Sequence, residues 1–337
     1  MNTKRILSVI AVTIITFTAA TAQRISVVTE SGATSVYRTL QQAIEEAEPG
    51  STIYLPGGGF SIADEVKISK KLTIIGIGHK SDNENADGST IISGNLFFNE
   101  NSSGSAVMAC YITGNVNIGE GGAEVNDVTI KFCNLNSVQV KNSTCQETTV
   151  NQNYIRGGVI FSGANGTISN NVISYIRDIN GGIITNNIIC GTQYVSYQTY
   201  VIIANNSQID HNIIINPTNL DISGRSSANY VYRVGNCLIY NNMIKGGGDY
   251  TDEPINIGND SWNDVFDYYN GGAISPVSSF HFKGDYAQYE HQVGIYAGDS
   301  FNEDQLAPVP YIVSKSIPQQ TDAAGKLNIK IRVKAGE

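Results

Sequence analysis

A six-residue phrase, apolar-x-x-Asn-x-apolar, recurs along the middle of this 337-residue chain and constrains its fold more than any other feature. It occurs five times, at residues 150–155, 168–173, 184–189, 209–214 and 239–244. Two earlier copies, at 107–112 and 130–135, carry Cys110 and Cys133 where the others carry Asn. A repeat this short buries its apolar face only by stacking on its neighbours, so the pattern predicts a solenoid.

The spacing of the repeat indicates which solenoid the chain forms. The Asn or Cys of each phrase, which we call the ladder position, recurs after 23, 20, 18, 16, 25 and 30 residues. Helical-hairpin repeats need more than about 30 residues and long 3.6-residue periodicity. Short Val, Ile and Asn segments between glycines instead predict an all-β fold, a parallel β-helix of roughly ten coils. One coil is read as three strands, at 116–118, 125–128 and 130–132.

The ladder position has a structural explanation. Asn tolerates the left-handed backbone that a sharp corner needs, and its amide can bond to identical amides above and below. Cys110 and Cys133 indicate that the position points inward, because Cys is small and prefers burial. These two cysteines would stack about 4.8 Å apart, so a disulfide and two buried free thiols are both open. None of the five cysteines has the spacing of a metal site.

The first 22 residues have the composition of a secretory signal. Two basic residues precede an apolar run that begins at Ile6, and Ala20-Thr21-Ala22 suits cleavage before Gln23. This run is too short for a comfortable membrane span, and no later segment approaches ~20 apolar residues. We therefore expect an exported protein without an integral membrane segment, in the periplasm, outside the cell or at the cell surface.

The charge of the chain bears on its partners. The formal net charge is −9, and an acidic chain repels phosphate backbones. We therefore expect no nucleic-acid partner. Acidity is common both in proteins that meet neutral glycans and in proteins that bind cations, so charge alone does not choose between these.

The chain after the signal divides into three predicted regions. Residues 23–71 form an N-terminal cap of short strands and one helix over 37–47, with an apolar face of Leu40, Ala43, Ile44 and Ala47. Residues 72–307 form the β-helix. Residues 308–337 form a C-terminal hairpin-like segment with strands at 311–315 and 327–334. The second of these alternates apolar with basic residues, as a half-buried strand with a basic outer face does.

Several of these features resemble a known family. The cap helix, the segment at 49–58, the strand Leu72-Thr73-Ile74-Ile75-Gly76 and the Asn-Asn-x-Ile rungs are similar to secreted bacterial right-handed parallel β-helix proteins of the pectin-lyase-like superfamily. The resemblance covers about residues 37–300. It implies right-handed coils, in agreement with the general rule for parallel crossovers.

The resemblance also implies a class of function. Enzymes of this fold often act on acidic polysaccharides, with carboxylates that hold calcium and an Arg or Lys that abstracts the proton beside a uronate. The Asp-Asp, Gly-His-Gly and Arg-Ile-Lys phrases of polygalacturonases are absent here, as is the Trp-, Asp- and His-rich signature of pectate lyases. Binding is therefore favoured over catalysis, and a divergent lyase stays open.

The two longest coils hold the candidate site residues, because a solenoid extrudes its extra residues on one face. The insertions contain these candidate ligand-binding and catalytic residues: Tyr194, Tyr197, Tyr200, Asp221, Arg225, Tyr230, Tyr232 and Arg233. The tyrosines could stack on sugar rings while arginines pair with carboxylates, or both could simply pack along strands. Arg225 or Arg233, with Asp221 nearby, are also candidate lyase residues, although an Arg base needs unusual activation.

Three further features carry two readings each. The carboxylates in Asp249-Tyr250-Thr251-Asp252-Glu253 would suit calcium, or form an ordinary solvated turn. His211 beside Asn212 is a stacked structural histidine or a general base. Trp262, the single tryptophan, is a sugar platform or a lid over the core.

Taken together, the sequence predicts an exported, monomeric protein that binds or processes a polysaccharide, with binding favoured. One alternative is a polysaccharide lyase or glycoside hydrolase that acts on acidic glycans. The other is a structural or adhesive surface protein whose rod is a spacer. No cofactor is expected, apart from calcium if the acidic turn binds it.

Overall fold

The structure is a computed structural model. It describes residues 24–63, 66–80, 88–191, 201–215, 232–245, 254–269, 279–306, 309–316, 318, 320, 325–326 and 329–334. The predicted signal at 1–22 lies outside this range. Among the described residues, no helix has both the length and the apolarity to cross a membrane.

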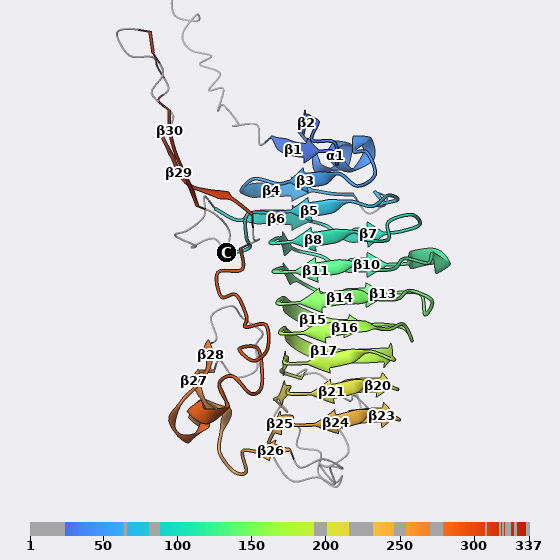
Figure 1. The fold of residues 1–337 in the computed structure, drawn as a ribbon, viewed down its shortest axis with the longest axis vertical. Coiled ribbons are helices and arrows are strands. Elements are labelled where there is room, and N and C mark those ends of the chain that lie inside the picture. Colours follow the sequence, from blue (N-terminus) through green and yellow to red (C-terminus); the bar gives the residue numbers. More distant parts are fainter. Residues whose placement is uncertain are drawn as a thin grey trace, which may run out of the picture.

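Two long sheets of short strands make up most of the molecule (Figure 1). The first has eleven strands, in the order β2 (Thr34–Tyr37), β1 (Ile25–Val28), β3 (Thr52–Tyr54), β5 (Thr73–Ile75), β8 (Ala106–Met108), β11 (Thr129–Lys131), β14 (Thr148–Asn151), β16 (Gly166–Ser169), β18 (Ile183–Thr185), β21 (Gln208–Asp210) and β24 (Leu238–Tyr240). From β3 onward every pairing in this sheet is parallel. Only β1 pairs in antiparallel fashion, with β2 and β3.

The second sheet has fifteen strands, all of its pairings parallel. One row is β4 (Gly58–Ser61), β6 (Thr90–Ser93), β9 (Tyr111–Ile112), β12 (Asn134–Leu135), β15 (Tyr154–Ile160), β17 (Val172–Asn180), β19 (Ile188–Ile189), β22 (Ile213–Ile214), β25 (Met243–Ile244) and β26 (Ile255–Asn256). A second row, joined to it through β15 and β17, holds β7 (Leu96–Phe98), β10 (Val116–Ile118), β13 (Val138–Val140), β20 (Ile202–Asn205) and β23 (Tyr232–Gly235).

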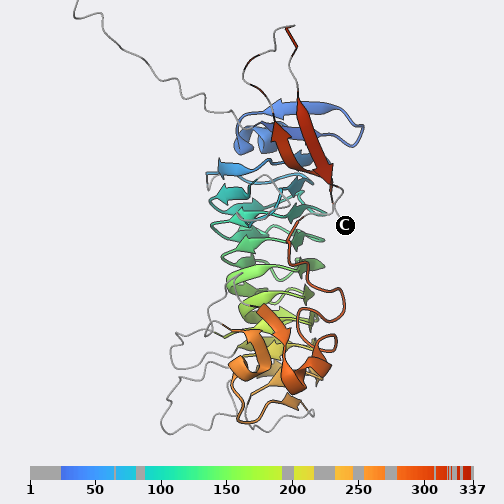
Figure 2. The ribbon, with the colours of Figure 1, turned by 90° about the vertical axis from the view of Figure 1, so that its left-hand side faces the viewer.

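The chain visits these rows in a fixed rotation. After β11 in the first sheet it passes through β12 and β13 in the second, then returns to the first one step further along as β14. Both views of the ribbon show the steps stacked in sequence order (Figures 1 and 2). The prediction of an all-β chain built on stacked parallel strands is confirmed. The predicted strand at 125–128 is absent, because the coil runs from β10 to β11 without it.

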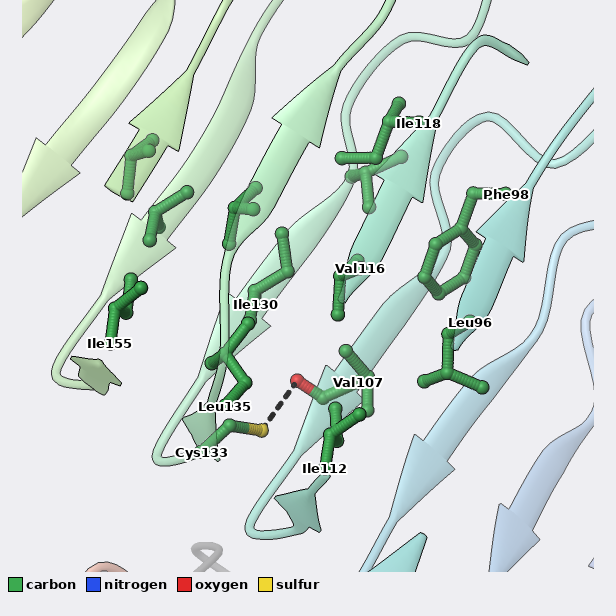
Figure 3. Packing of buried hydrophobic residues seen from close by; sticks show 14 of the residues in the cluster. Leu96, Phe98, Val107, Ile112, Val116, Ile118, Ile130, Cys133, Leu135 and Ile155 are labelled. Carbon is green, nitrogen blue, oxygen red and sulfur yellow. Dashed lines mark hydrogen bonds between the residues drawn. The ribbon is translucent and has the colours of Figure 1, made fainter. Parts of the chain in front are cut away.

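The repeated phrase turns the corner between the two sheets. Its first apolar residues, Val150, Ile168, Ile184 and Ile209, pair in register within the first sheet and are fully buried. Its last apolar residues, such as Ile155 and Ile173, pair in register within the second sheet and are equally buried. Figure 3 shows side chains from both sheets pointing into the core between them. Stacking therefore buries the apolar positions of successive copies together, and only the last copy, with a partly buried Ile239, is less covered.

The ladder asparagines form a continuous chain of hydrogen bonds inside this corner. Asn153, Asn171, Asn187, Asn212 and Asn242 are all fully buried. The Oδ1 of Asn187 accepts from both the backbone N–H and the Nδ2 of Asn171, each at 3.0 Å. Its own Nδ2 contacts the carbonyls of Ile168 and Thr185 and the Oδ1 of Asn212. The predicted inward orientation is confirmed, and the amides satisfy backbone groups that stacking alone would leave unpaired.

The predicted left-handed corner exists, but at a different residue. Positive φ belongs to the residue before each ladder position, with values of 52° to 56° at Ala109, Phe132, Gln152, Asn170, Asn186, His211 and Asn241. No ladder Asn is among the described residues with positive φ. Asn is therefore kept at the ladder position for its buried amide and not for its backbone tolerance. The left-handed residue places its side chain on the outside of the corner.

An N-terminal cap covers the first coil. Helix α1 (Leu40–Glu46) begins after Thr39, whose hydroxyl accepts from the N–H of Gln42 at 3.2 Å, and it buries Leu40, Ala43 and Ile44. The structure thus has a helix where the sequence predicts one. It starts later than predicted, because Tyr37 belongs to β2.

The chain after β26 folds into a lobe on the outer face of the later coils. The lobe contains α2 (Trp262–Val265), β27 (Phe266–Tyr268), β28 (Ser279–Phe282) and a 3-10 helix at Gly284–Tyr289. Its buried aromatic side chains pack on outward-facing residues of the second sheet, including Val172, Ile188 and Met243. Residues 290–306, which we call the return segment, then run back along the outside of the corner. They reach His79, and Leu306 lies beside Gly78.

The C-terminal strands pair as an antiparallel hairpin, β29 (Tyr311–Ser316) with β30 (Lys330–Lys334). It lies at the same end of the stack as β1 and β2 (Figures 1 and 2). The predicted half-buried strand is wrong, because both rows of β30 are exposed: Ile331 is 54% and Val333 is 58% exposed. The alternation of residue types holds, but no other element in the described part of the chain covers the apolar side.

All five cysteines are described, and their thiols are free. Cys110 and Cys133 are fully buried, and Cys133 Sγ lies 3.7 Å from the Val107 carbonyl (Figure 3). Burial raises the pKa of the Cys133 thiol to about 12. Of the two states left open by the sequence, the structure shows buried thiols that act as small apolar side chains.

The ladder predicts a large stability cost for a small change. Replacing Asn187 by Ala leaves the Asn171 backbone N–H buried without a partner, and it removes the amide that donates to the Ile168 and Thr185 carbonyls. We expect Asn187→Ala to lower the free energy of unfolding by about 3 kcal/mol, measured by urea denaturation. Asn206→Ala is the matched control, because Asn206 is exposed, and its cost should stay below about 1 kcal/mol. Equal costs at the two positions would contradict a stabilising ladder.

Candidate functional site

Both long insertions leave the stack at one corner, between the two rows of the second sheet. The first insertion begins after Gly191, whose N–H bonds to the Ser174 carbonyl, and ends at Val201, whose carbonyl accepts from Ile176 N–H, both at 2.9 Å. Its two ends therefore flank Tyr175. The second insertion begins after Ile215, which bonds to the Ile189 carbonyl one coil away. The expectation that the insertions belong to neighbouring coils is confirmed for their ends.

A set of Tyr–Arg pairs lies at this corner, which we call the insertion corner. The guanidinium carbon of Arg177 lies 4.4 Å from the ring centroid of Tyr175. That ring in turn covers Gly158 in the preceding coil, where a Cβ would come within 2.0 Å of it. The position must therefore be glycine for Tyr175 to lie flat beneath the guanidinium. The ring holds Arg177 in place through cation–π attraction and stacking.

A second pair repeats this arrangement nearer the N-terminal end. Arg156 lies 5.0 Å from the ring centroid of Tyr111 and donates through Nη1 to Asn134 Oδ1 at 2.8 Å. These three residues come from three successive coils, in β9, β12 and β15. The guanidinium is fixed at the surface while part of its donor set stays uncommitted among the described residues.

The chemistry of this corner suits anions with planar oxygen pairs. A guanidinium presents a rigid fork of N–H donors that matches a carboxylate in two parallel hydrogen bonds. Arg177 Nε is buried without a hydrogen-bond partner among the described residues, so the Nη atoms are the part of this guanidinium that an anion can meet. Ordering the side chain beforehand lowers the entropy lost when an anion binds. The arrangement can therefore recognise carboxylates without any further change in Arg156 or Arg177.

The predicted site residues fall mostly outside the described part of the chain. This applies to Tyr194, Tyr197, Tyr200, Asp221, Arg225 and Tyr230, and also to the acidic turn at 249–253. The backbone of β23 places Tyr232 opposite Ile202 and Arg233 opposite Ile203. No group of three or more His, Cys, Asp or Glu side chains that could hold a metal occurs in the ranges that the structure covers.

Trp262 is placed clearly. Its side chain is 4% exposed and stacks on Phe266 with ring centroids 5.6 Å apart and planes at 14°. A sugar platform needs an open aromatic face, and this ring has none of useful size. Of the two readings of Trp262, the structure favours the lid over the core, within the C-terminal lobe.

The most concentrated group of titratable side chains lies in that lobe. His281 Nε2 is 2.9 Å from Glu303 Oε1, and its Nδ1 contacts Glu290 Oε1. Its ring stacks on Tyr296 at 4.0 Å, and the Tyr296 hydroxyl donates to Glu303 Oε1 at 2.6 Å. Carboxylates only accept, so both imidazole nitrogens donate and His281 is held as a cation. We call these four residues the His281 clasp.

The clasp joins the lobe to the return segment and to the stack. Glu290 Oε2 also accepts from the Phe282 N–H at 2.8 Å, and Lys80 donates to the carbonyl of Glu303. Its proton-bearing groups are therefore committed to one another. That arrangement suits a structural contact that holds the lobe in place, whereas a catalytic acid or base needs an atom that is free to contact substrate.

The comparisons add no family. The chain matches no protein-family model, and searches of curated proteins and of solved structures find no match either. The site is therefore argued from its own geometry.

Sequence reasoning missed Tyr111, Arg156, Tyr175 and Arg177. Each Arg lies within a few residues of a ladder phrase, as in Asn153-Tyr154-Ile155-Arg156 and Val172-Ile173-Ser174-Tyr175-Ile176-Arg177. A basic residue just beyond the rung in two successive coils was the available signal. The pairing of Arg156 with Tyr111 spans two coils, and no local pattern shows it.

The clasp predicts a pH dependence of the lobe. Burial lowers the pKa of His281, but Glu290 and then Glu303 outweigh it and raise the pKa above its ordinary value. A group whose pKa is higher in the folded than in the unfolded protein stabilises the fold fully when the pH is below the unfolded pKa, about 6.5 for His. This contribution to the free energy of unfolding is lost as the pH rises through the folded pKa. We expect the melting temperature followed by Trp262 fluorescence to fall as pH rises above about 6.5.

A matched variant tests the assignment. His281→Gln keeps two polar contacts but cannot titrate, so its melting temperature should be lower near pH 6 and should lose this slope. The hydrogen bond from Tyr296 lowers the pKa of Glu303, so the clasp weakens again in acid, below the ordinary carboxyl range. An unchanged slope in His281→Gln would show that another group is responsible.

Proposed function

We propose that the chain is an exported, right-handed parallel β-helix protein of roughly ten coils that binds an acidic polysaccharide at the insertion corner. The observation that carries this proposal is the pair of ordered guanidinium groups at this corner, Arg177 in the strand next to the first insertion and Arg156 one coil earlier. The handedness, the coil number and the export signal rest on the sequence pattern. The stacked parallel sheets support the β-helix itself.

The ligand class follows from the local charge. The chain as a whole is acidic, with 30 acidic and 21 basic residues, so a polyanion meets repulsion over most of the surface. Arg156 and Arg177 are a local exception, and each is held over a Tyr ring. Carboxylates of a uronate-containing glycan would pair with these forks, while repulsion elsewhere would confine the chain of sugars to the corner.

The insertions complete the proposed surface. Tyr194, Tyr197, Tyr200, Tyr230, Tyr232, Arg225 and Arg233 belong to the insertions or their ends, and both insertions start from this corner. Tyr rings supply stacking area for sugars at a low cost in conformational entropy. Binding is favoured over catalysis because, among the described residues, neither Arg156 nor Arg177 contacts a carboxylate or an imidazole with which it could form an acid–base pair.

Substitution of the arginines tests the proposal directly. We expect Arg177→Ala and Arg156→Ala each to weaken binding of a uronate polysaccharide roughly tenfold or more, measured by titration calorimetry. Arg177→Lys keeps the charge and loses the fork, so it should recover only part of the affinity. Lys131→Ala is the matched control, because Lys131 lies 4.7 Å from the Phe132 ring on a different sheet. Its affinity should equal that of the wild type.

The same panel separates the alternatives. Release of unsaturated uronate products, seen by ultraviolet absorbance and abolished by Arg225→Ala or Arg233→Ala, would make the protein a lyase. No binding of any acidic glycan by the wild type would leave the rod as a spacer. Equal losses of affinity in Lys131→Ala and Arg177→Ala would show that binding depends on the overall charge of the protein and not on this site.

A further inference from the structure

A cavity of about 560 Å³ lies at a different corner, where the first sheet turns into the second. One wall is the outer side of the left-handed residues Asn186, His211 and Asn241. The other wall belongs to residues 289–298, at the end of the lobe and the start of the return segment. Its size is within the range of small-ligand sites. We call it the corner cavity.

The return segment creates this cavity by the way it crosses the corner. It is fastened to Asn170, whose Nδ2 donates to the carbonyls of Ile295 and Ala297 at 2.9 and 2.8 Å. It is fastened again where Gly294 N–H donates to the His211 carbonyl at 2.8 Å. Asn186 occupies the equivalent corner position between these two coils. Its side-chain amide makes no hydrogen bond with any described residue, whereas that of Asn170 makes two.

Glycine allows the close approach on which this geometry depends. Gly298 has φ +60°, and a Cβ there would lie 2.7 Å from the Nδ2 of Asn186. Gly294 has φ +76°, and a Cβ there would lie 2.4 Å from Ile213. The segment therefore passes beside the Asn186 amide without covering it. The amide is left facing a built cavity and not bulk surface alone.

The polar groups of the cavity are biased toward acceptors. His291 Nδ1 lies 3.3 Å from the Tyr296 carbonyl, which only accepts, so Nδ1 donates and Nε2 keeps its lone pair. Gln292 Nε2 donates to the Gln288 carbonyl at 2.6 Å, which leaves Oε1. Asn241 Nδ2 lies 3.2 Å from His211 Nε2, which leaves its Oδ1. Among the described residues, nothing donates to these three acceptors.

The lining disfavours an anionic ligand. No Lys, Arg, Asp or Glu is among the described residues that line the cavity. Asp210 stands behind His211, with Oδ1 3.6 Å from Nδ1, and so favours the tautomer that carries its proton on Nδ1. Ile255 and the ring of Tyr289, which are both partly exposed, add apolar surface. The cavity therefore offers several acceptors, one complete amide and an apolar wall, without a counter-charge for a carboxylate or phosphate.

We propose that the corner cavity binds a neutral sugar residue. Sugar hydroxyls supply the donors that its acceptors lack, and they can also accept from Asn186 Nδ2. The C–H face of a pyranose suits the apolar wall. A uronate would bury its carboxylate without a partner, at a cost that a neutral sugar does not have. This site does not depend on the proposed function, because it lies at another corner and selects a neutral ligand instead of an anion.

The test uses the full chain and four defined probes: maltose, cellobiose, mannobiose and, as the charged comparison, digalacturonate. Ligand-observed NMR and titration calorimetry should show saturable binding of at least one neutral disaccharide. Asn186→Ala should weaken that binding at least tenfold, and Gln292→Ala should weaken it as well. Neither side chain supports the core, so Gln292→Ala should keep the melting temperature of the wild type. Asn186→Ala should lower it only slightly, because Ala109 already adopts the same left-handed corner conformation. Asn206→Ala, an exposed Asn elsewhere on the stack, should bind as the wild type does.

The controls separate this site from the insertion corner. Arg156→Ala and Arg177→Ala should leave neutral-disaccharide binding unchanged even if they abolish binding of acidic glycans. The proposal is overturned if no neutral disaccharide binds the wild type. It is also overturned if Asn186→Ala binds as well as the wild type, if digalacturonate competes for the same cavity with equal affinity, or if the arginine variants remove the neutral binding.

Discussion

The fold depends on a buried hydrogen-bonded column of amides. Each coil of the stack has a sharp turn between its two sheets, and at that turn backbone N–H and carbonyl groups point inward, away from water. Asn171, Asn187 and Asn212 satisfy these groups with side chains that also bond to one another. An apolar residue would fill the same space and leave the polar groups unpaired, at a cost comparable to the stability of a whole coil. The apolar core can stack continuously only because this column is satisfied.

The column also explains where the outer surface becomes useful. Because the left-handed residue precedes the ladder position, its side chain lies on the convex side of the corner and is free of any role in the core. Gln152 uses this freedom to accept from the Asn302 N–H, and Asn170 binds the carbonyls of the return segment. The same structural position thus serves as a fastening in some coils and as the wall of a cavity in others. Its residue type varies while its backbone does not.

Much of this could be read from the sequence, and the remainder has identifiable causes. The parallel stack and the buried ladder were predictable, because a buried amide must recur in a fixed frame and Cys110 marks the same inward position. The position of the left-handed residue could not be predicted, because Ala109, Phe132 and His211 adopt the same backbone conformation with unrelated side chains. The Arg156–Tyr111 pair was missed because its members lie 45 residues apart and meet only through stacking. The return segment carries no repeat, so nothing in it indicated the corner against which it packs.

The hydrogen bonds of the ladder also have a direction. In each step the oxygen of a later asparagine accepts from the backbone and side chain of the one before it, from the Cys133 N–H down to Asn242. A stack interrupted partway would end in donors that still lack an acceptor, and the coil that supplies the acceptor is always the next one along the chain. Each coil therefore relies on the next coil along the chain to satisfy its buried donors, so the two ends of the stack are chemically different.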